Sequence, residues 1–351
     1  MKQIIDLVRP AIRKALSAGS NHNDSVVESR PKVSMHLNEN PFGTPQNRYV
    51  NLSELHSREV IGQLKGGLRP QCISLSRGTA DAIERLMRTF CMQGQDNIIV
   101  VQPTVDIYAH VARVNDIEVR DVQMDEQFRL DVDAVLGAVD SKTKMIILSS
   151  PNNPTGNLQQ PESILQLCNQ FEGIVVVDEA FVEFSRNESL VRNISSCPNL
   201  VVVESLSVAY ALASSRIAVI LAHPQVIRAV EVLRYAFSLD TSTAEIIESL
   251  PRRRFDADKW VKALLDERTK LLAAIAQLPI CDKVYPTSAN FFMVKFKGAA
   301  KVYQYLLSNG IAVYDCSHIP GCEDCLRITV GLPVDNTAIV SALRQYGESL
   351  R

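Results

Sequence analysis

The sequence of 351 residues lacks the features that mark several large classes of protein. It contains no apolar run of the roughly 18 residues that a membrane-spanning helix needs. Its 37 basic and 39 acidic residues nearly cancel, so bulk charge favours neither nucleic acid nor an anionic membrane. Charged residues stand among the first ten positions, where a secretory signal would carry an apolar block. We therefore expect a cytoplasmic protein without nucleic-acid or membrane partners.

A disulfide framework is also not expected, although the chain has eight cysteines. They are scattered along a long chain, unlike the cysteines of a small secreted domain. The segment 316–325 is an exception, because it gathers several soft metal ligands, but a structural zinc site usually joins two separated ligand pairs. We expect reduced thiols and no metal, and keep a zinc-stabilised interaction protein as an alternative. Its ligands would be Cys316, His318, Cys322 and Cys325.

Short apolar runs separated by helix-length segments dominate the first two-thirds of the chain. They occupy residues 98–101, 145–148, 174–177, 200–203 and 217–221. Strands that are apolar on both faces belong in a parallel sheet covered by helices. We predict an α/β fold with a mostly parallel, doubly wound sheet in a large domain spanning residues 44–245.

The character of the chain changes after residue 243. Apolar residues at helical spacing between Val261 and Leu278 predict a long amphipathic helix. Further strands are expected at 291–296, 311–313 and 326–330, and helices at 299–308 and 335–346. These elements predict a smaller α+β domain that includes residues 246–351.

Polar residues follow several of the predicted strands, where ligands gather in sheets of this kind. Asn153, Asp178 and the segment 205–207 all stand there. An aspartate that ends a buried strand needs a partner, and a helix cap is the competing explanation. Gly78 and Thr79 enter a predicted helix, whose first amides could hold a phosphate, although Thr79 could equally be a simple N-cap.

Three motifs in this order resemble the pyridoxal-phosphate aminotransferases of fold type I, most closely the histidinol-phosphate aminotransferase family. They are PNNPTG at 151–156, VVVDEAF at 175–181 and ESLSVAYALASSR at 204–216. The resemblance extends from LNENPFG at 37–43 to CLRITVG at 325–331, so it covers nearly the whole chain. It implies a homodimer, and a small domain that also includes residues 1–43 as an N-terminal arm with its helix.

The resemblance also implies a pyridoxal-phosphate site. Asp178 would keep the pyridine nitrogen protonated, Asn153 would face the ring oxygen and Tyr108 would stack on the ring. Arg327 would take a substrate carboxylate as a bidentate pair, with an ordinary surface arginine as the alternative. The other cofactor residues would be Gly78, Thr79, Ala80, Ser205, Ser207, Arg216 and Tyr49 of the partner subunit.

The departures from the family pattern stand where the reaction takes place. Val208 occupies the position of the lysine that carries the cofactor as a Schiff base, and the sequence has no lysine between Lys144 and Lys259. Phe181 replaces a tyrosine that bonds the ring oxygen. Tyr314 replaces the arginine that binds the substrate phosphate.

We interpret these changes, with Ser214 at a usual glycine, as loss of transamination. The leading hypothesis is a degenerate relative that binds a small phosphorylated or amino-acid-like ligand, non-covalent pyridoxal phosphate, or a partner chain. The alternative is an active aminotransferase that uses non-covalently held cofactor. Its substrates would be an amino acid or histidinol phosphate, with 2-oxoglutarate.

Overall fold

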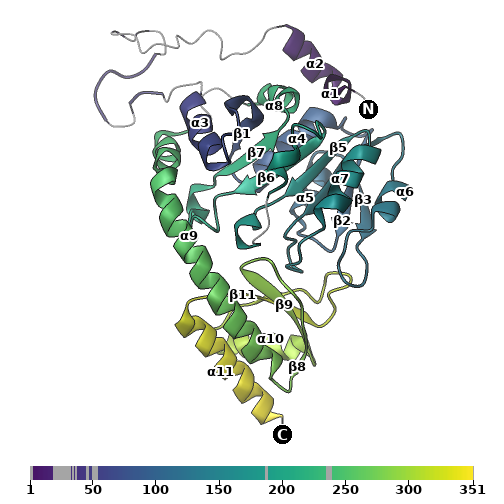
Figure 1. Ribbon diagram of the computed structural model, residues 1–351, viewed down its shortest axis with the longest axis vertical. Coiled ribbons are helices and arrows are strands. Elements are labelled where there is room, and N and C mark those ends of the chain that lie inside the picture. Colours follow the sequence, from purple (N-terminus) through teal and green to yellow (C-terminus); the bar gives the residue numbers. More distant parts are fainter. Residues whose placement is uncertain are drawn as a thin grey trace.

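The computed structural model describes residues 3–18, 33, 35, 38–44, 47–49, 54–185, 189–234 and 239–350. A larger part around a seven-stranded sheet is joined to a smaller part around a four-stranded sheet by one long helix (Figure 1). The larger sheet has the order β1-β7-β6-β5-β4-β2-β3, and the smaller one the order β10-β11-β9-β8.

The helices and strands have the following bounds. The α-helices are α1 (Ile4–Leu7), α2 (Pro10–Ser17), α3 (Leu55–Leu64), α4 (Thr79–Phe90), α5 (Ile107–Val114), α6 (Val132–Gly137), α7 (Pro161–Gln170), α8 (Pro224–Glu231), α9 (Thr241–Ala276), α10 (Ala299–Ser308) and α11 (Pro333–Ser349). The strands are β1 (Ile73–Ser76), β2 (Asn97–Gln102), β3 (Glu118–Gln123), β4 (Thr143–Ser149), β5 (Ile174–Asp178), β6 (Leu200–Ser205), β7 (Ala218–Ala222), β8 (Cys281–Val284), β9 (Phe291–Phe296), β10 (Tyr314–Asp315) and β11 (Cys325–Thr329).

Both faces of the larger sheet are covered by helices. In β5, Val175 and Val177 belong to one buried cluster, with apolar side chains from α3, α6, α7 and α9. Ile174 and Val176 belong to a second cluster, with side chains from α1, α2, α4, α5 and α8. Because successive side chains of a strand point to opposite faces, both faces need apolar residues. The predicted α/β fold with a mostly parallel, doubly wound sheet is confirmed.

Two strands of the larger sheet differ from the pattern of buried parallel strands. β7 pairs antiparallel with both β6 and β1, although it is as apolar as its parallel neighbours. β3 pairs parallel with β2 at the sheet edge, and most of its residues are exposed or half-buried. An apolar run therefore locates a central strand but gives no direction, and it misses an edge strand.

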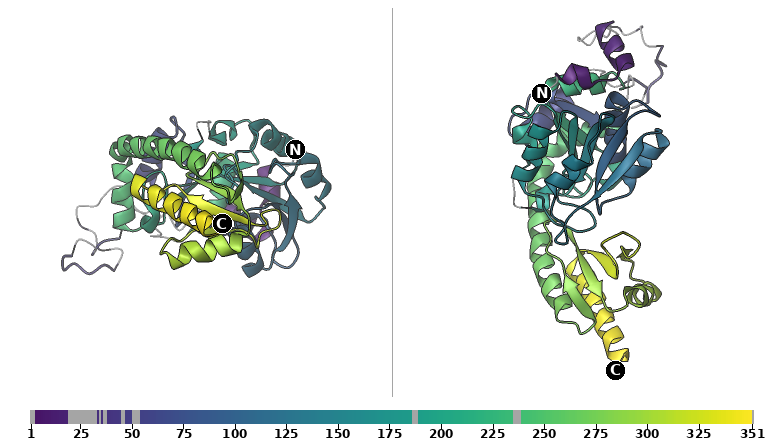
Figure 2. Two further views of the ribbon diagram at one scale, coloured as in Figure 1. Left: turned by 90° about the horizontal axis from the view of Figure 1, so that it is seen from below. Right: turned by 90° about the vertical axis from the view of Figure 1, so that its right-hand side faces the viewer.

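The N-terminal helices were expected to pack with the smaller part. They pack instead on the larger part. Ile4, Val8 and Ile12 lie in the buried cluster that contains the apolar faces of α4 and α8. The backbone amide of Arg9 donates to the carbonyl of Thr89 at 3.0 Å. These helices lie at the end of the molecule opposite the C-terminus (Figure 2). The segment 17–31 is rich in polar residues, which predicts a linker, and its residues 19–31 lie outside the described residues.

Helix α9 is longer than the sequence pattern indicated. It begins at Thr241, where the Asp240 side chain accepts a hydrogen bond from the Thr243 amide at 2.9 Å, and it contains Pro251. The helix therefore runs through the boundary proposed at residue 245 and contributes apolar residues to both parts. None of the described helices is both long and apolar enough to cross a bilayer.

The loop after β4 joins the two parts through Gly156. This residue has φ of +78°, and a Cβ added there would lie 2.4 Å from the Thr287 hydroxyl oxygen. The amide of Ser288 donates to the Gly156 carbonyl at 2.7 Å. The glycine permits both the backbone conformation and the close approach of the loop before β9.

We expect Gly156→Ala to lower the free energy of unfolding by roughly 1–3 kcal/mol, because left-handed backbone and the Thr287 contact both oppose a methyl group. Urea unfolding would measure the change. Gly137→Ala is the matched control, since a Cβ there meets nothing within 4 Å. An equal effect of the two substitutions would contradict this account.

Candidate functional site

The predicted site residues meet at one edge of the larger sheet. β4, β5 and β6 are parallel neighbours, so Asn153, Asp178 and Ser205 all lie at or beyond their carboxyl ends. β7 runs in the opposite direction, which brings Arg216, just before it, to the same edge. β1 is antiparallel to β7, so the turn at Gly78 joins them. The sheet topology thus gathers segments more than a hundred residues apart.

Asp178 finds its partner in Tyr108. The tyrosine hydroxyl donates to Oδ2 of Asp178 at 2.7 Å, and the amide of Ala180 donates to Oδ1 at 2.9 Å. Burial raises the pKa of Asp178, although both hydrogen bonds oppose the shift. The Tyr108 side chain is fully buried, and burial followed by the nearby carboxylate raises its pKa. Stacking on a cofactor ring would require Tyr108 to move from this position.

The turn before α4 and the turn before β7 meet at one corner, the predicted anion-binding corner. Gly78 has φ of +92°, and a Cβ added there would lie 2.5 Å from an Nη atom of Arg216. Arg216 is exposed, and its guanidinium donates to the Ala213 carbonyl at 3.4 Å. Thr79 and Ala80 are the first residues of α4 and are half-buried. The guanidinium therefore lies directly against the start of a helix of 12 residues, where an anion is favoured.

Ser205 and Ser207, in the motif at 204–216, are joined by a hydrogen bond within the turn after β6. The hydroxyl of Ser205 accepts a hydrogen bond from the amide of Ser207 at 3.2 Å. Ser205, which ends β6, is buried, and Ser207, two residues beyond, is half-buried. They are the groups that could complete an anion site together with Arg216.

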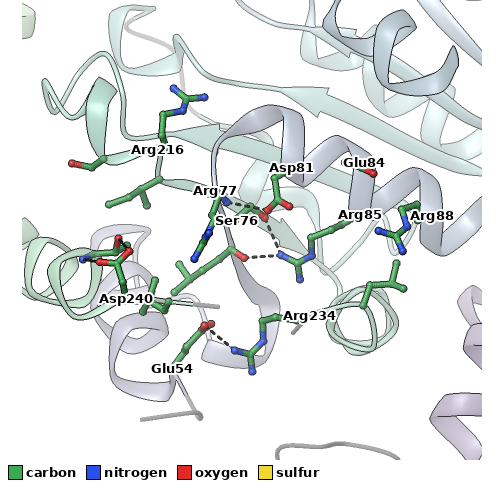
Figure 3. A pocket seen from close by; sticks show the side chains of 16 residues that line it. Glu54, Ser76, Arg77, Asp81, Glu84, Arg85, Arg88, Arg216, Arg234 and Asp240 are labelled. Atoms are coloured by element: carbon green, nitrogen blue, oxygen red, sulfur yellow. Dashed lines mark hydrogen bonds and ion pairs between the residues drawn. The ribbon is translucent and has the colours of Figure 1, made fainter. Parts of the chain in front are cut away.

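A cavity of about 620 Å³ opens beside this corner (Figure 3). Figure 3 shows Arg85 directed toward Ser76 and Arg234 toward Glu54, which agrees with a 3.0 Å hydrogen bond and a 2.8 Å ion pair. The charged residues that line the cavity are Arg77, Arg85, Arg88, Arg216 and Arg234, with Glu54, Asp81, Glu84 and Asp240. Asn153, Asp178 and Val208 do not line this cavity. Of the predicted cofactor residues, Arg216 alone lines the cavity. Gly78, Thr79, Ala80, Ser205 and Ser207 do not, so the cavity lies beside the predicted site and is not that site.

Arg327 reaches from the smaller sheet to the loop after β4. Its Nη1 donates to Oδ1 of Asn153 at 2.5 Å. The guanidinium carbon lies 4.5 Å from the ring centroid of Tyr314 and 5.3 Å from that of Phe291. Burial lowers the pKa of Arg327, and its Nε is buried without a hydrogen-bond partner among the described residues. The resemblance implies Asn153, Arg327 and Tyr314 as substrate-binding residues, and Arg327 contacts both of the others.

Val208 stands three residues beyond the end of β6, on the same side of the sheet as Phe181. Both side chains are half-buried and pack against the cluster that contains Val175. The Phe181 ring meets the Phe291 ring edge-on, with centroids 4.9 Å apart. The side chains at these two positions offer only apolar contact to a ligand.

A lysine from elsewhere in the sequence does lie near this turn, and the sequence analysis missed it. Lys65, which ends α3, forms an ion pair with Glu204, and its Nζ lies 3.7 Å from Glu183. Burial opposes the charge, but the neighbouring carboxylates raise the pKa of Lys65 above its usual value. A protonated amine is no nucleophile, so Lys65 does not replace the missing group.

The carboxylates around Lys65 form a buried acidic cluster. Burial first, and then the charge of Glu204, raises the pKa of Glu179 to about 8. The amide of Leu190 donates to Glu179 at 2.9 Å. Burial also raises the pKa of Glu183. An acidic residue that ends or follows an apolar strand, as Glu179 and Glu204 do, was the available sequence signal.

The cysteine-rich segment does not form a zinc site. Cys316, Cys322 and Cys325 are buried, whereas His318 is exposed and meets the Tyr314 ring with centroids 6.1 Å apart. In the part of the chain that the structure describes, no group of three or more His, Cys, Asp or Glu side chains could hold a metal ion. The structure therefore gives the zinc alternative no ready set of ligands.

Tyr49 lies in an exposed loop before α3. Its side chain is 55% exposed, and its amide donates to Glu39 at 2.7 Å. An exposed position is compatible with the predicted contact of Tyr49 of the partner subunit. That contact stays a prediction. Leu37, with which the first motif begins, and residues 50–53, which follow this loop, lie outside the described residues.

The chain is similar to known proteins along most of its length. A family model described as aminotransferase class I and II matches residues 43–343. The chain belongs to this family. A histidinol-phosphate aminotransferase of Bacteroides fragilis is 34% identical over 346 residues, which are 99% of this chain and 100% of that relative. One from Parabacteroides distasonis is 35% identical over 344 residues, covering 98% and 99%. These relatives confirm the resemblance stated from the motifs.

Solved structures agree with this aminotransferase fold. The histidinol-phosphate aminotransferase of Clostridium acetobutylicum has a TM-score of 0.80 at 18% identity, and the match covers 87% of this chain and 92% of that one. The enzyme of Sinorhizobium meliloti, solved in complex with pyridoxal-5'-phosphate, has a TM-score of 0.78 at 19% identity, covering 87% and 84%. At these identities the likeness shows the fold.

We expect the stability of this chain to fall as pH rises from about 5 to about 8, in part through Glu179. Its pKa in the folded state lies above that of an unfolded glutamate, so its contribution is present at low pH and is lost as pH rises through about 8. The slope from one proton is at most about 1.4 kcal/mol per pH unit.

Glu179→Gln should flatten this slope while keeping an acceptor for Leu190. Urea unfolding at pH 5 and pH 8 measures it. Glu126→Gln, at an exposed position, is the control. An unchanged slope in Glu179→Gln would show that this carboxyl group is not the one that titrates.

Proposed function

We propose that this chain is a histidinol-phosphate aminotransferase-like protein that does not transaminate and that retains a partial pocket for pyridoxal phosphate or another small phosphorylated ligand. The single observation that carries the proposal is Val208. An aliphatic side chain stands at the end of β6, where the family resemblance requires a primary amine.

The anion-binding end supports the retention of a pocket. Arg216 lies against the Gly78 backbone, so a side chain at position 78 would fill the space that the guanidinium uses. Ser205 and Ser207 lie on the neighbouring turn. Together with the start of α4, these groups could hold a phosphate by charge-assisted hydrogen bonds.

The residues expected around the cofactor ring, Asp178 and Asn153, support the same ligand, although Asp178 already has a partner in Tyr108. Each oxygen of Asp178 already accepts one hydrogen bond, and a carboxylate oxygen can accept a second. Asp178 would stabilise a protonated ring nitrogen, and Asn153 would donate to the ring oxygen. When bound, pyridoxal phosphate supplies an electron sink. The ring would have to share Asp178 with Tyr108.

Loss of the reaction follows from the groups around Val208. A missing general acid–base costs about a hundred- to ten-thousand-fold in rate, and loss of the covalent tether adds to it. Lys65 is held by Glu204 on the acidic side of the turn. Phe181 has no hydroxyl to bond the ring oxygen. Val208 removes the amine that would hold the cofactor covalently, and Phe181 removes the hydroxyl that would bond the ring oxygen. The two changes therefore act on the same bound cofactor.

The second candidate is an active aminotransferase that holds its cofactor non-covalently. The contact between Arg327 and Asn153 favours it. It places a guanidinium, which can bind the carboxylate of an amino-acid substrate, next to the position expected for the ring. Its substrates would be an amino acid or histidinol phosphate, with 2-oxoglutarate. A cytoplasmic homodimer is part of both proposals.

Covalent labelling separates the two states of position 208. We expect wild-type protein mixed with pyridoxal phosphate and then reduced with borohydride to show no label at Val208 by peptide mass mapping. Val208→Lys should gain nearly one phosphopyridoxyl group at residue 208, because the new amine would lie beside the anion-binding corner. Val208→Met controls for the change in size. A Val208→Lys protein that folds but does not label would mean that the pocket is not a cofactor pocket.

Restoring the other two contacts tests the loss of catalysis. Val208→Lys alone should bind cofactor with little turnover, whereas the triple change with Phe181→Tyr and Tyr314→Arg should recover measurable transamination of histidinol phosphate. The assay is release of glutamate from 2-oxoglutarate. Turnover by the wild-type chain at about 1 per second or faster, an ordinary enzyme rate, would overturn the proposal in favour of the second candidate.

A further inference from the structure

A buried cluster of charged side chains lies beside the cavity of about 620 Å³, and three of its five members line that cavity. Glu231 pairs with Arg58, and with Arg234 at 2.8 Å. Its other carboxylate oxygen lies 3.3 Å from Arg85. Glu54 pairs with Arg234 at 2.8 Å. The side chains of this Glu231 cluster are at most 16% exposed, and its three arginines outnumber its two glutamates.

The positive charge of Arg85 is not fully compensated within the Glu231 cluster. Its guanidinium donates to the hydroxyls of Ser74 and Ser76 at 2.9 and 3.0 Å, but its Nε is buried without a hydrogen-bond partner among the described residues. Burial lowers the pKa of Arg85, and the charge of Arg234 acts in the same direction, although Glu231 opposes both. A buried charge without full compensation is costly, so an anion in the cavity would stabilise the cluster.

Helix α4 adds two more charged side chains to the wall that contains Arg85. Glu84 and Arg88 are half-buried and line the cavity. Side chains three or four positions apart share one face of a helix, and Figure 3 shows both residues beside Arg85. Because Arg88 is only half-buried, its guanidinium can contact a ligand directly, whereas the buried Arg85 acts through its charge.

Two further carboxylates of the lining belong to the beginnings of helices. Asp81 accepts a hydrogen bond from the backbone amide of Arg77 at 2.9 Å, and Asp240 accepts one from the amide of Thr243 at 2.9 Å. The positive ends of α4 and α9 therefore offset part of their negative charge. With these two carboxylates engaged, the charges around the cavity still favour an anion.

The uncharged part of the lining is largely aliphatic. Leu75, Ile217, Leu233 and Leu239 line the cavity, and none of its described lining residues is aromatic. The cavity of about 620 Å³ has the size of a small-molecule pocket and exceeds the space that one inorganic ion needs. This lining offers apolar contact to a hydrocarbon group, without a ring on which an aromatic ligand could stack.

We propose that the cavity is a second ligand site, which binds a small aliphatic carboxylate. Arg88 binds the carboxylate, the excess charge of the Glu231 cluster stabilises it, and its hydrocarbon part lies against the half-buried side chains of Leu233 and Leu239. The inference goes beyond the proposed function and does not depend on it, because Asp178 and Val208 lie outside the cavity lining.

Three probes test the charge and the shape of the ligand separately. They are isocaproate, which is a branched six-carbon carboxylate, its neutral amide isocaproamide, and inorganic phosphate. Each is titrated into the full chain by ligand-observed nuclear magnetic resonance, with and without saturating pyridoxal phosphate. We expect isocaproate to bind at least tenfold more tightly than either other probe, and to bind with pyridoxal phosphate present.

Substitutions of opposite sign on one helix face assign the site. Arg88→Gln should weaken isocaproate binding at least fivefold, whereas Glu84→Gln should tighten it at least twofold, because it removes a negative charge from the same wall. Arg58→Gln should weaken it at least threefold through the cluster, since Arg58 does not line the cavity. Arg113→Gln, in the last turn of α5 as Arg88 is in that of α4, is the matched control and should change nothing. Far-UV circular dichroism checks that each variant is folded.

The failures of this inference and of the proposed function are distinguishable. Equal binding of isocaproate and isocaproamide, or no binding of isocaproate to folded wild-type protein, would overturn the inference. Phosphate that binds as tightly as isocaproate would overturn the ligand class. Strict competition with pyridoxal phosphate would place the carboxylate in the predicted cofactor site and overturn the second site. If isocaproate binds as expected and pyridoxal phosphate does not bind, the proposed cofactor pocket is wrong and the inference stands.

Discussion

The structure depends on one constraint, which is the burial of strands β4, β5 and β6 on both faces. Apolar side chains on both sides leave polar groups a place only where the strands end, and parallel pairing puts those ends at one edge. Asp178 is the clearest result. Its carboxylate is buried, and the hydroxyl of Tyr108 together with the amide of Ala180 satisfies it. The gathering of these polar groups is therefore a consequence of the sheet and does not depend on the residue at position 208.

The charges near the edge are divided between two separate places. Arg216 and the start of α4 form a corner that favours an anion, whereas Lys65 and the carboxylates of Glu179 and Glu204 form a buried acidic cluster. Val208 stands on the turn that separates them. An amine on this turn would have met an anion site on one side and a filled ion pair on the other. The chain instead carries its buried lysine where it stabilises carboxylates, which is a structural role.

Contact between the two parts of the molecule concentrates on the loop after β4. Asn153 accepts from Arg327, and Gly156 approaches the segment that precedes β9. The ring end of the pocket and the carboxylate end are thus held by the same few residues.

The sequence by itself determined the fold class, the central strands and the family, because continuous apolar runs and local motifs are short-range properties of the chain. It also indicated that Asn153, Asp178 and Ser205 lie at one edge, since strand ends converge in any such sheet. Only the tertiary structure decided the direction of β7, the packing of α1 and α2 on the larger part, the pairing of Lys65 with Glu204, and the bond from Tyr108 to Asp178. Each of these joins residues far apart in sequence. Their partners are selected by burial and charge in three dimensions, and no local pattern carries that information.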